Sequence, residues 1–253
     1  MIRISASAVR IGIMSVALMI AGCASLSSAP SGSGAAQTRL QLGLEYLVRD
    51  HVEAARDNLQ KAERVAPMDV QVQLGMALYE QHIGENQAAE KRYRRLLQQS
   101  PANGSVLNNY GAFLCRLGQY VAAQQQFDAA VQLADYHQVA DALENAGYCF
   151  LNAGRTQDAA QWLGRALRYE PGKGNRLLAE ANSRFAAGDY EQAQMLLLRV
   201  YQPRLAASAE SLWLQIRFAA RAEKHDDVER YGKQLARSFP QSKQYQQFLA
   251  NEY

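Results

Sequence analysis

The sequence has few of the residues that build metal centres and disulfide scaffolds. Its 253 residues include 3 cysteines and 4 histidines. So few cysteines exclude a dense disulfide scaffold and disfavour a zinc site made of cysteine pairs. Proline is also scarce, at 6 residues, which suits a helical protein.

The chain also lacks an excess of charge of either sign. Lys and Arg total 27 and Asp and Glu total 24, for a net charge of +3. A nucleic-acid surface needs a clustered basic excess, so we expect no nucleic-acid partner. Because 48% of the residues are hydrophobic and 20% are charged, the composition is that of a globular chain and excludes wholesale disorder.

The N-terminus has the features of a secretory signal peptide. Arg3 and Arg10 form a basic start, and the apolar run IGIMSVALMI follows at residues 11–20. That run is too short for a bilayer core of about 30 Å but matches the apolar region of a signal peptide. The next four residues, Ile-Ala-Gly-Cys ending at Cys23, resemble a bacterial lipobox. We therefore expect residues 1–22 to be a lipoprotein signal peptide; the alternative is an ordinary cleavage site with an incidental cysteine.

The lipobox resemblance implies that Cys23 becomes a lipidated N-terminus carrying diacylglycerol and an N-acyl chain such as palmitate. Several acyl chains anchor a protein stably, whereas one gives only marginal binding. Residue 24 is Ala rather than Asp, which by resemblance to enterobacterial sorting favours the outer membrane. The expected location is the outer membrane, lipid-anchored on the periplasmic face. Loss of Arg3 and Arg10 leaves a mature net charge of 3 − 2 = +1.

An uncharged segment rich in Ser, Gly and Ala follows Cys23. Residues 24–36 read ASLSSAPSGSGAA and cannot bury a core. We therefore predict a lipidated flexible tether at 23–36, which would hold a folded domain away from the membrane. The alternative is an ordered N-terminal segment.

Small residues recur at a nearly constant interval in the rest of the chain. The first small residue of each unit recurs mostly at 34-residue spacing, and an alanine follows it 12 residues later. The recurring positions are Gly43, Ala77, Gly111, Gly147 and Ala181, then Ala55, Ala89, Ala123, Ala159 and Ala193, and then Pro67, Pro101 and Pro171. This is the tetratricopeptide repeat (TPR) pattern, in which two antiparallel helices cross at small residues (Gly43 against Ala55, for example) and proline ends the second helix.

The pattern predicts an all-α fold, a right-handed superhelical solenoid of about six TPR helix pairs over residues 37–253. We place the repeats at about 36–69, 70–103, 104–137, 140–173, 174–207 and 209–242. The third repeat has no closing proline, so a small insertion at 135–139 is expected to bend the superhelix. The sixth repeat is degenerate, as terminal repeats often are, and the tail after it predicts a short capping helix.

The sequence offers no constellation for catalysis or for a metal. His51, His82, His137 and His225 lack the spacing of metal ligands. The glycine-rich stretch at 171–174 lies at a repeat junction and lacks the strand and the Lys-Ser/Thr pair of a phosphate loop. We therefore expect a protein that is not an enzyme, with no metal, no cofactor beyond the lipid on Cys23 and no small-molecule substrate.

Two cysteines, Cys115 and Cys149, lie at nearly the same height on the first helices of adjacent repeats. Adjacent helices pack about 8–10 Å apart, and a disulfide needs Cα atoms about 4.4–6.8 Å apart, so a bridge is plausible. In an oxidising periplasm we favour the disulfide. The alternative is a pair of buried free thiols that act as small apolar residues.

The first helices of a TPR solenoid line its concave face, where partners bind. The register places ten partner-binding candidates there: Leu40, Leu44, Leu47, Leu74, Leu78, His82, Asn108, Ala112, Arg116 and Tyr148. The same face continues through Glu144, Leu178, Asn182, Phe185, Trp213 and Arg217. Its first half is apolar, which usually marks a partner site. The alternative is that these leucines pack against the tether or simply line a tight superhelix.

Several stretches outside the repeat consensus resemble one family. The run Val106-Leu107-Asn108-Asn109-Tyr110-Gly111-Ala112-Phe113-Leu114 looks like the third repeat of the type IV pilus biogenesis lipoproteins, PilF and PilW. The segments LQLGLEYL at 40–47, SLWLQIR at 211–217 and FPQS at 239–242 are similar too. The resemblance covers the whole mature chain. It implies an outer-membrane lipoprotein that helps the pilus secretin to assemble or remain stable, with the secretin as partner. The alternative is a general periplasmic TPR adaptor that binds peptidoglycan enzymes or joins outer-membrane protein assembly.

Overall fold

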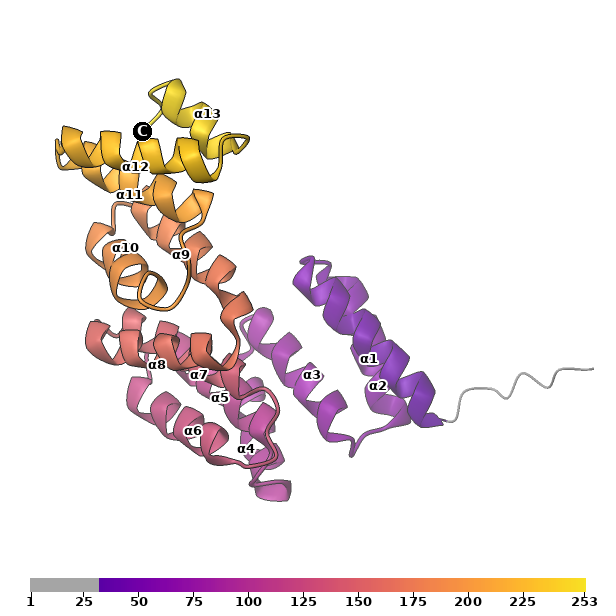
Figure 1. Ribbon diagram of the computed structural model, residues 1–253. Coiled ribbons are helices and arrows are strands. Elements are labelled where there is room, and N and C mark those ends of the chain that lie inside the picture. The colour runs from indigo at the N-terminus through magenta and orange to yellow at the C-terminus, as the bar shows by residue number, and fades with distance from the viewer. Residues whose placement is uncertain (1–31) are drawn as a thin grey trace, which may run out of the picture.

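The computed structural model describes residues 32–253, and within them the chain forms paired α-helices and no strand (Figure 1). The six pairs are α1 Gly32–Val48 with α2 Val52–Val65, α3 Val70–His82 with α4 Asn86–Gln99, α5 Gly104–Arg116 with α6 Tyr120–Gln132, α7 Val139–Asn152 with α8 Thr156–Tyr169, α9 Gly174–Ala186 with α10 Tyr190–Met195, and α11 Ala209–Arg221 with α12 His225–Ser238. A final helix, α13 Lys243–Leu249, closes the chain. The predicted all-α architecture of helix pairs is therefore confirmed.

The first helix begins earlier than the sequence pattern predicts. Helix α1 begins at Gly32, so residues 32–36 of the predicted tether are helical, and Ala36 is buried. Alanine is the best helix former and packs closely, which extends the helix towards the N-terminus. The predicted boundary at residue 37 is corrected to 32. The signal peptide and Cys23 lie outside the described residues.

Local signals start the helices and reverse the chain between them. The Asp69 side chain accepts hydrogen bonds from the backbone N–H groups of Gln71 and Val72 and caps α3, and Asn103 caps α5 in the same way. The turn inside each pair places one residue at positive φ: Gly84, Gly118, Gly154 and Gly188 in the middle repeats, and Asp50 and Glu223 in the terminal ones. Glycine adopts this backbone conformation without a steric penalty. The two terminal repeats thus depart from the pattern in their turns as well.

The small residues at the helix crossings allow the paired helices to touch. A Cβ atom added to Gly147 would lie 2.5 Å from Cγ of Leu163, and one added to Gly43 would lie 2.6 Å from Cγ of Leu59. Such contacts are far shorter than van der Waals packing allows, so only glycine fits. The nearest side chain to Gly43 is thus Leu59, rather than the predicted Ala55.

The hydrophobic core is continuous through the middle of the solenoid and separate at its ends. Buried residues from α3 to α11 form one large cluster around Tyr93, Phe113, Phe127 and Phe150. A second cluster joins α1, α2 and α3, and a third joins α11, α12 and α13. Because each repeat packs mainly on its neighbours, the ends of the solenoid have cores of their own.

Two junctions depart from a regular repeat. Residues 133–138 separate α6 from α7 at the predicted insertion, and the ring of Tyr136 packs there on Gly104, where an added Cβ would lie 2.4 Å from the ring. The other junction was not predicted. Helix α10 passes directly into a π-helix, η2 Leu196–Tyr201, and a connection of several residues then leads to α11. Figure 1 shows α9–α13 stacked at the end of the molecule opposite to α1–α3.

Candidate partner-binding groove

Three of the predicted groove leucines are core residues. Leu40, Leu47 and Leu74 keep only 4%, 8% and 5% of their surface exposed. The Leu40 side chain fills the space beside Gly75 of α3, where an added Cβ would lie 2.5 Å from its Cδ1 atom. The prediction that these three line a water-facing surface is therefore wrong, because α1 and α3 pack tightly enough to bury them. Leu44 and Leu78 are half-buried and still reach the surface.

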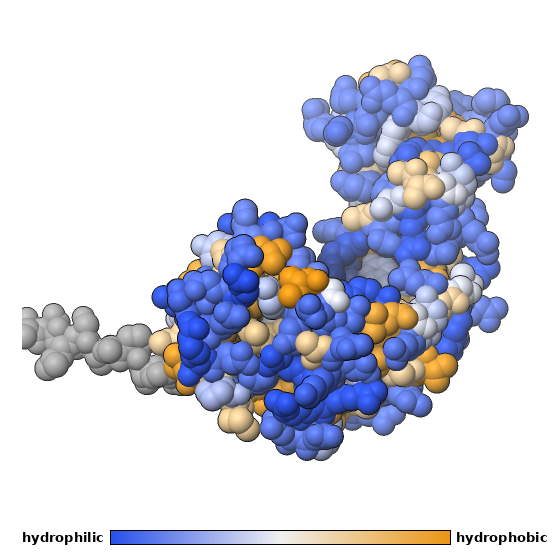
Figure 2. Space-filling model, turned by 180° about the vertical axis from the view of Figure 1, so that it is seen from behind, coloured by the Kyte–Doolittle hydropathy of each residue, from blue (hydrophilic) through white to orange (hydrophobic). Residues whose placement is uncertain are grey.

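The face of the molecule in Figure 2 has no large continuous hydrophobic patch. Figure 2 shows small hydrophobic patches on a mostly hydrophilic face, and a hollow between the N-terminal lobe at the left and the C-terminal stack. The most exposed apolar side chains of the first three repeats are Val48, Met68 and Val121, at 89%, 72% and 73%. None of them was a predicted groove residue. Of the five predicted groove leucines, only Leu44 and Leu78 therefore keep part of their side chains accessible.

The next predicted residues make contacts between repeats. His82 is exposed, and its Nε2 atom lies 2.8 Å from Oδ1 of Asp50 in the turn of the first repeat. Arg116 is also exposed and donates a hydrogen bond of 3.1 Å to the backbone carbonyl of Gln81. Both side chains thus bridge adjacent repeats along one edge of the groove.

The middle of the groove is polar and largely satisfied from within. Asn108 is buried, and its Oδ1 accepts a hydrogen bond of 3.0 Å from Nδ2 of Asn145. Ala112 and Tyr148 are half-buried. Burial, with a further contribution from the carboxylate of Glu144, raises the pKa of the Tyr148 hydroxyl above its ordinary value. The side-chain oxygen of Asn108 is thus already bonded to Asn145. Tyr148 is only half-buried, so a partner can reach it.

A buried ion-pair cluster lies below the groove, at the junction of the fourth and fifth repeats. Glu144 and Lys173 are 3% and 5% exposed, and Nζ of Lys173 donates to Glu144 at 3.0 Å and also to Asp141. Arg176 lies 3.3 Å from the same Glu144 oxygen. Burial lowers the pKa of Lys173, but its hydrogen bonds to both carboxylates outweigh burial and raise it. Sequence reasoning missed Lys173, because no local pattern links it to Glu144, 29 positions away.

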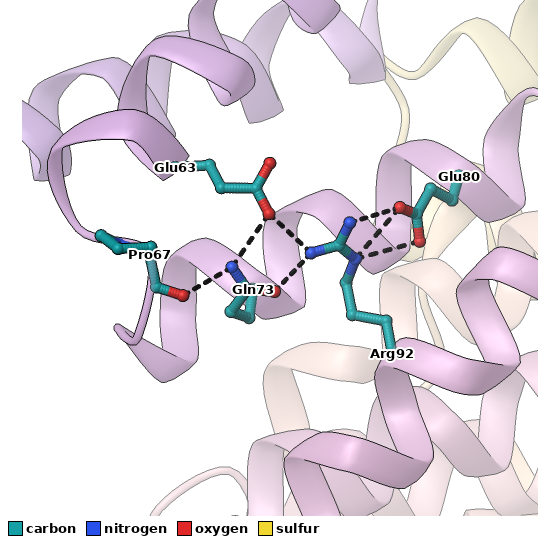
Figure 3. Close-up of polar contacts among 5 residues, drawn as sticks. All are labelled: Glu63, Pro67, Gln73, Glu80 and Arg92. Carbon is teal, nitrogen blue, oxygen red and sulfur yellow. Dashed lines mark hydrogen bonds and ion pairs between the residues drawn. The ribbon is translucent and has the colours of Figure 1, made fainter.

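A second charged cluster ties the first two repeats together (Figure 3). Arg92 of α4 lies 2.7 Å from Glu63 of α2 and 3.0 Å from Glu80 of α3. Gln73 accepts from Arg92 and donates to Glu63 and to the carbonyl of Pro67. Because the guanidinium is surrounded by partners of the same chain, this cluster stabilises the fold and has no vacant position for a ligand.

The C-terminal part of the face exposes cations in place of leucines. Leu178 and Trp213 are buried, whereas Asn182, Phe185 and Arg217 are half-buried. The Arg217 guanidinium lies 4.2 Å from the centre of the Phe185 ring and donates to Oδ1 of Asn182 at 3.4 Å. Burial lowers the pKa of Arg217, and no carboxylate of the described residues forms an ion pair with it.

The cysteine pair joins the third and fourth repeats. The Sγ atoms of Cys115 on α5 and Cys149 on α7 lie 2.17 Å apart, and their Cα atoms lie 5.7 Å apart, within disulfide range. The two helices pack side by side, as the repeat register predicts. The link spans the irregular junction at 133–138, so it holds together the two repeats that this junction separates.

The described residues contain neither a candidate metal site nor a candidate membrane-spanning helix. Among residues 32–253 no three His, Cys, Asp or Glu side chains gather in a way that could hold a metal ion. No helix in that part of the chain is both long and apolar enough to cross a bilayer. The half-buried leucines and the arginine stacked on Phe185 make the groove the candidate functional surface.

Comparison with known families identifies the repeats. Two tetratricopeptide-repeat models match the chain, over residues 40–104 and 102–169. The second of these stretches includes the irregular junction at 133–138. The predicted TPR solenoid is thereby confirmed for the first four helix pairs.

Comparison with individual proteins extends the similarity beyond the repeats. The type IV pilus assembly protein PilF of Pseudomonas aeruginosa is 31% identical over 213 residues, which is 84% of each chain. A solved structure of Pseudomonas aeruginosa PilF matches with a TM-score of 0.58 at 30% identity, covering 87% of this chain and 99% of that one. A crystal structure of PilW, described as a widely conserved type IV pilus biogenesis factor, matches with a TM-score of 0.57 at 26% identity, covering 85% and 98%.

Proposed function

The chain belongs to the PilF/PilW family of tetratricopeptide-repeat proteins, and we propose that it acts in type IV pilus biogenesis as a non-enzymatic lipoprotein of the outer membrane. The observation that carries this proposal is similarity over 84% of a type IV pilus assembly protein and over 99% and 98% of the solved PilF and PilW chains. That similarity extends over 213 residues, whereas the generic repeat models together match only residues 40–169.

In this proposal the lipid on Cys23 holds the solenoid at the inner leaflet of the outer membrane, facing the periplasm. The groove of the first three repeats binds a segment of the pilus secretin and supports assembly or stability of its multimer. Leu44 and Leu78 supply the apolar contacts, His82 and Arg116 supply polar ones, and Tyr148 of the fourth repeat extends the polar contacts beyond this groove. Anchoring raises the local concentration of the two partners, so a modest groove affinity is sufficient.

The proposal is tested in a deletion strain by counting surface pili and by measuring the ratio of secretin multimers to monomers. We expect loss of multimers and of pili, with recovery on expression of the wild-type chain. The double variant Leu44→Glu with Leu78→Glu should fail to restore them, because two charges in the apolar contact cannot be desolvated. The matched control is Leu249→Glu on α13, whose side chain is 57% exposed and far from the first repeats.

The anchor is tested separately with Cys23→Ala, which should leave the chain outside the outer-membrane fraction and reduce the number of pili. Unchanged multimers and pili in the deletion strain would contradict the pilus role. If peptidoglycan enzymes or outer-membrane assembly proteins are captured in place of a secretin, and the double variant loses them, the general adaptor function holds instead.

A further inference from the structure

Two arginines on the last full repeat lack carboxylate partners. Arg217 and Arg221 stand one turn apart on α11, and neither forms an ion pair with another residue in the described part of the chain. Arg217 is half-buried and lies over Phe185, while Arg221 is exposed and lies 3.7 Å from the centre of the Tyr190 ring. Each guanidinium is thus held by an aromatic face and keeps donors free.

Three other cations that lie between helices have carboxylate partners. Arg92 pairs with Glu63 and Glu80, and Lys173 pairs with Glu144. Arg184, which lies near the C-terminal end of α9, pairs with Glu180 and Asp189. Desolvation of a cation is costly unless a counter-charge is supplied. Arg217 is desolvated in this way without a counter-charge, so an anion from outside the chain would be stabilised beside it.

The aromatic rings continue beneath both arginines into a pocket. Phe185 packs edge-on against Tyr190 and Phe218, with ring centres 5.1 Å and 4.8 Å away. Tyr190 and Phe218 also line a pocket of about 500 Å³ between α10, η2, α11 and α12, and Leu197, Leu198 and Tyr231 add to its apolar lining. Apart from Arg221, its charged lining consists of Lys224, Glu191 and Asp227, and the last of these pairs with Arg230. Arg221 lies at the edge of the same pocket. A cationic group that can bind an anion and an apolar surface therefore lie next to each other.

The spacing of the two arginines indicates the shape of the ligand. Residues four apart on a helix are separated by about 6 Å along its axis. Alternate residues of an extended chain are about 6.6 Å apart and point to the same side. Two acidic side chains at alternate positions of an extended segment therefore match the two guanidiniums.

We propose that the Arg217–Arg221 face of α11 binds an extended acidic segment of a protein partner, with carboxylates at alternate positions and a neighbouring large apolar side chain in the pocket. Because it lies in the last two repeats and takes a charged ligand, this site is separate from the groove of the proposed function. A guanidinium on an aromatic face keeps its planar donor edge available to a carboxylate, which favours this ligand over a purely apolar one.

The experiment measures binding of a fluorescent twelve-residue peptide to the purified full-length chain in detergent. The peptide alternates Asp with Thr and carries one central Phe, and its matched control has Asn in place of every Asp. We expect the Asp peptide to bind at least 10-fold more tightly than the Asn peptide at low salt, with an affinity that falls as salt is raised. Peptides with Asp at every third position should bind more weakly than the alternating one.

Variants locate the site. Arg217→Gln with Arg221→Gln should weaken Asp-peptide binding about 10-fold or more, while Arg217→Lys with Arg221→Lys should retain part of it. The matched control is Arg165→Gln, since that guanidinium also lies over an aromatic ring, Trp162, but on α8. Circular dichroism melts establish that every variant is folded.

The proposal is wrong if the Asp and Asn peptides bind equally, if the double Gln variant binds the Asp peptide as tightly as the wild type does, or if Arg165→Gln weakens binding as much. Such results leave the pilus role untouched, because that role is tested by pili and secretin multimers in cells.

Discussion

Lys173 and Glu144 form the most deeply buried ion pair of the described residues, with 6% and 3% of their side chains exposed. Removing Lys173 leaves the buried Glu144 carboxylate with the mostly exposed Arg176 as its remaining cation, whereas replacing both members of a buried pair by apolar groups can be nearly neutral. Lys173→Met should therefore lower the free energy of unfolding by about 3 kcal/mol. Denaturant melts of the single variant and of Lys173→Met with Glu144→Leu provide the test, and the double variant should be the more stable of the two. Equal stability of the wild type and the single variant would contradict this account of the junction.

Tyr148 makes stability depend on pH on the alkaline side. Burial, and then the carboxylates of Glu144 and Glu180, raise the pKa of its hydroxyl, so the folded chain keeps this proton at a pH where the unfolded chain, with a pKa of about 10, has lost it. The favourable contribution is complete below pH of about 10 and is lost as pH rises through the folded pKa. Above a pH of about 10, the unfolding free energy of the wild type should therefore fall as pH rises. In Tyr148→Phe this slope should be less steep, by up to about 1.4 kcal/mol per pH unit. The control is Tyr169→Phe, whose side chain is 66% exposed; an equal change in slope there would assign the effect to tyrosines in general.

At the scale of the helices, the Cys115–Cys149 link constrains α5 against α7. It closes a loop of 34 residues, for which the chain-entropy model predicts a stabilisation of about 3–4 kcal/mol. Cys115→Ala with Cys149→Ala should lower the midpoint of denaturant unfolding accordingly, and adding a reductant to the wild type should give a similar shift. Alkylation followed by mass spectrometry without reduction measures the oxidation state directly. Two alkylated thiols in the native protein would show that the pair is reduced.

The helices also show where reasoning from the sequence succeeds. The period of small residues identified the paired helices, because a close crossing needs a residue without a large side chain on one of them, as at Gly43 and Gly147. The same period placed Cys115 and Cys149 at nearly the same level on two adjacent first helices. It also placed Leu40 and Leu74 on first helices of their repeats but did not indicate their burial, since α1 and α3 approach closely enough to exclude water. The π-helix η2 has no signal in the repeat pattern, because the repeat specifies which residues face the neighbour and not the hydrogen bonds along the helix.

At the scale of the whole molecule, the solenoid is a row of units that contact mainly their neighbours. The C-terminal unit depends on α13, whose Phe248 ring covers Gly232 of α12 so closely that an added Cβ would lie 2.1 Å from it. Phe248→Ala should lower the local stability of α11 and α12 by about 2 kcal/mol, because it removes apolar contact from the last core cluster. Hydrogen exchange should accelerate in α11–α13 and remain unchanged in α1–α4. The control is Leu249→Ala, and faster exchange throughout the chain would indicate a single cooperative unit instead.

The helix pairs, their number and their small-residue crossings follow from spacing along the chain, and the family resemblance follows from the stretches outside the repeat consensus. The three-dimensional packing shows which predicted groove residues remain accessible, that Lys173 pairs with Glu144, and that Arg217 and Arg221 have no carboxylate partner among residues 32–253. These properties depend on the distance between helices that are far apart in sequence. A repeat pattern repeats side-chain types, but it does not specify how closely one repeat stacks on the next, and this stacking buries one leucine of the groove while leaving another half-exposed.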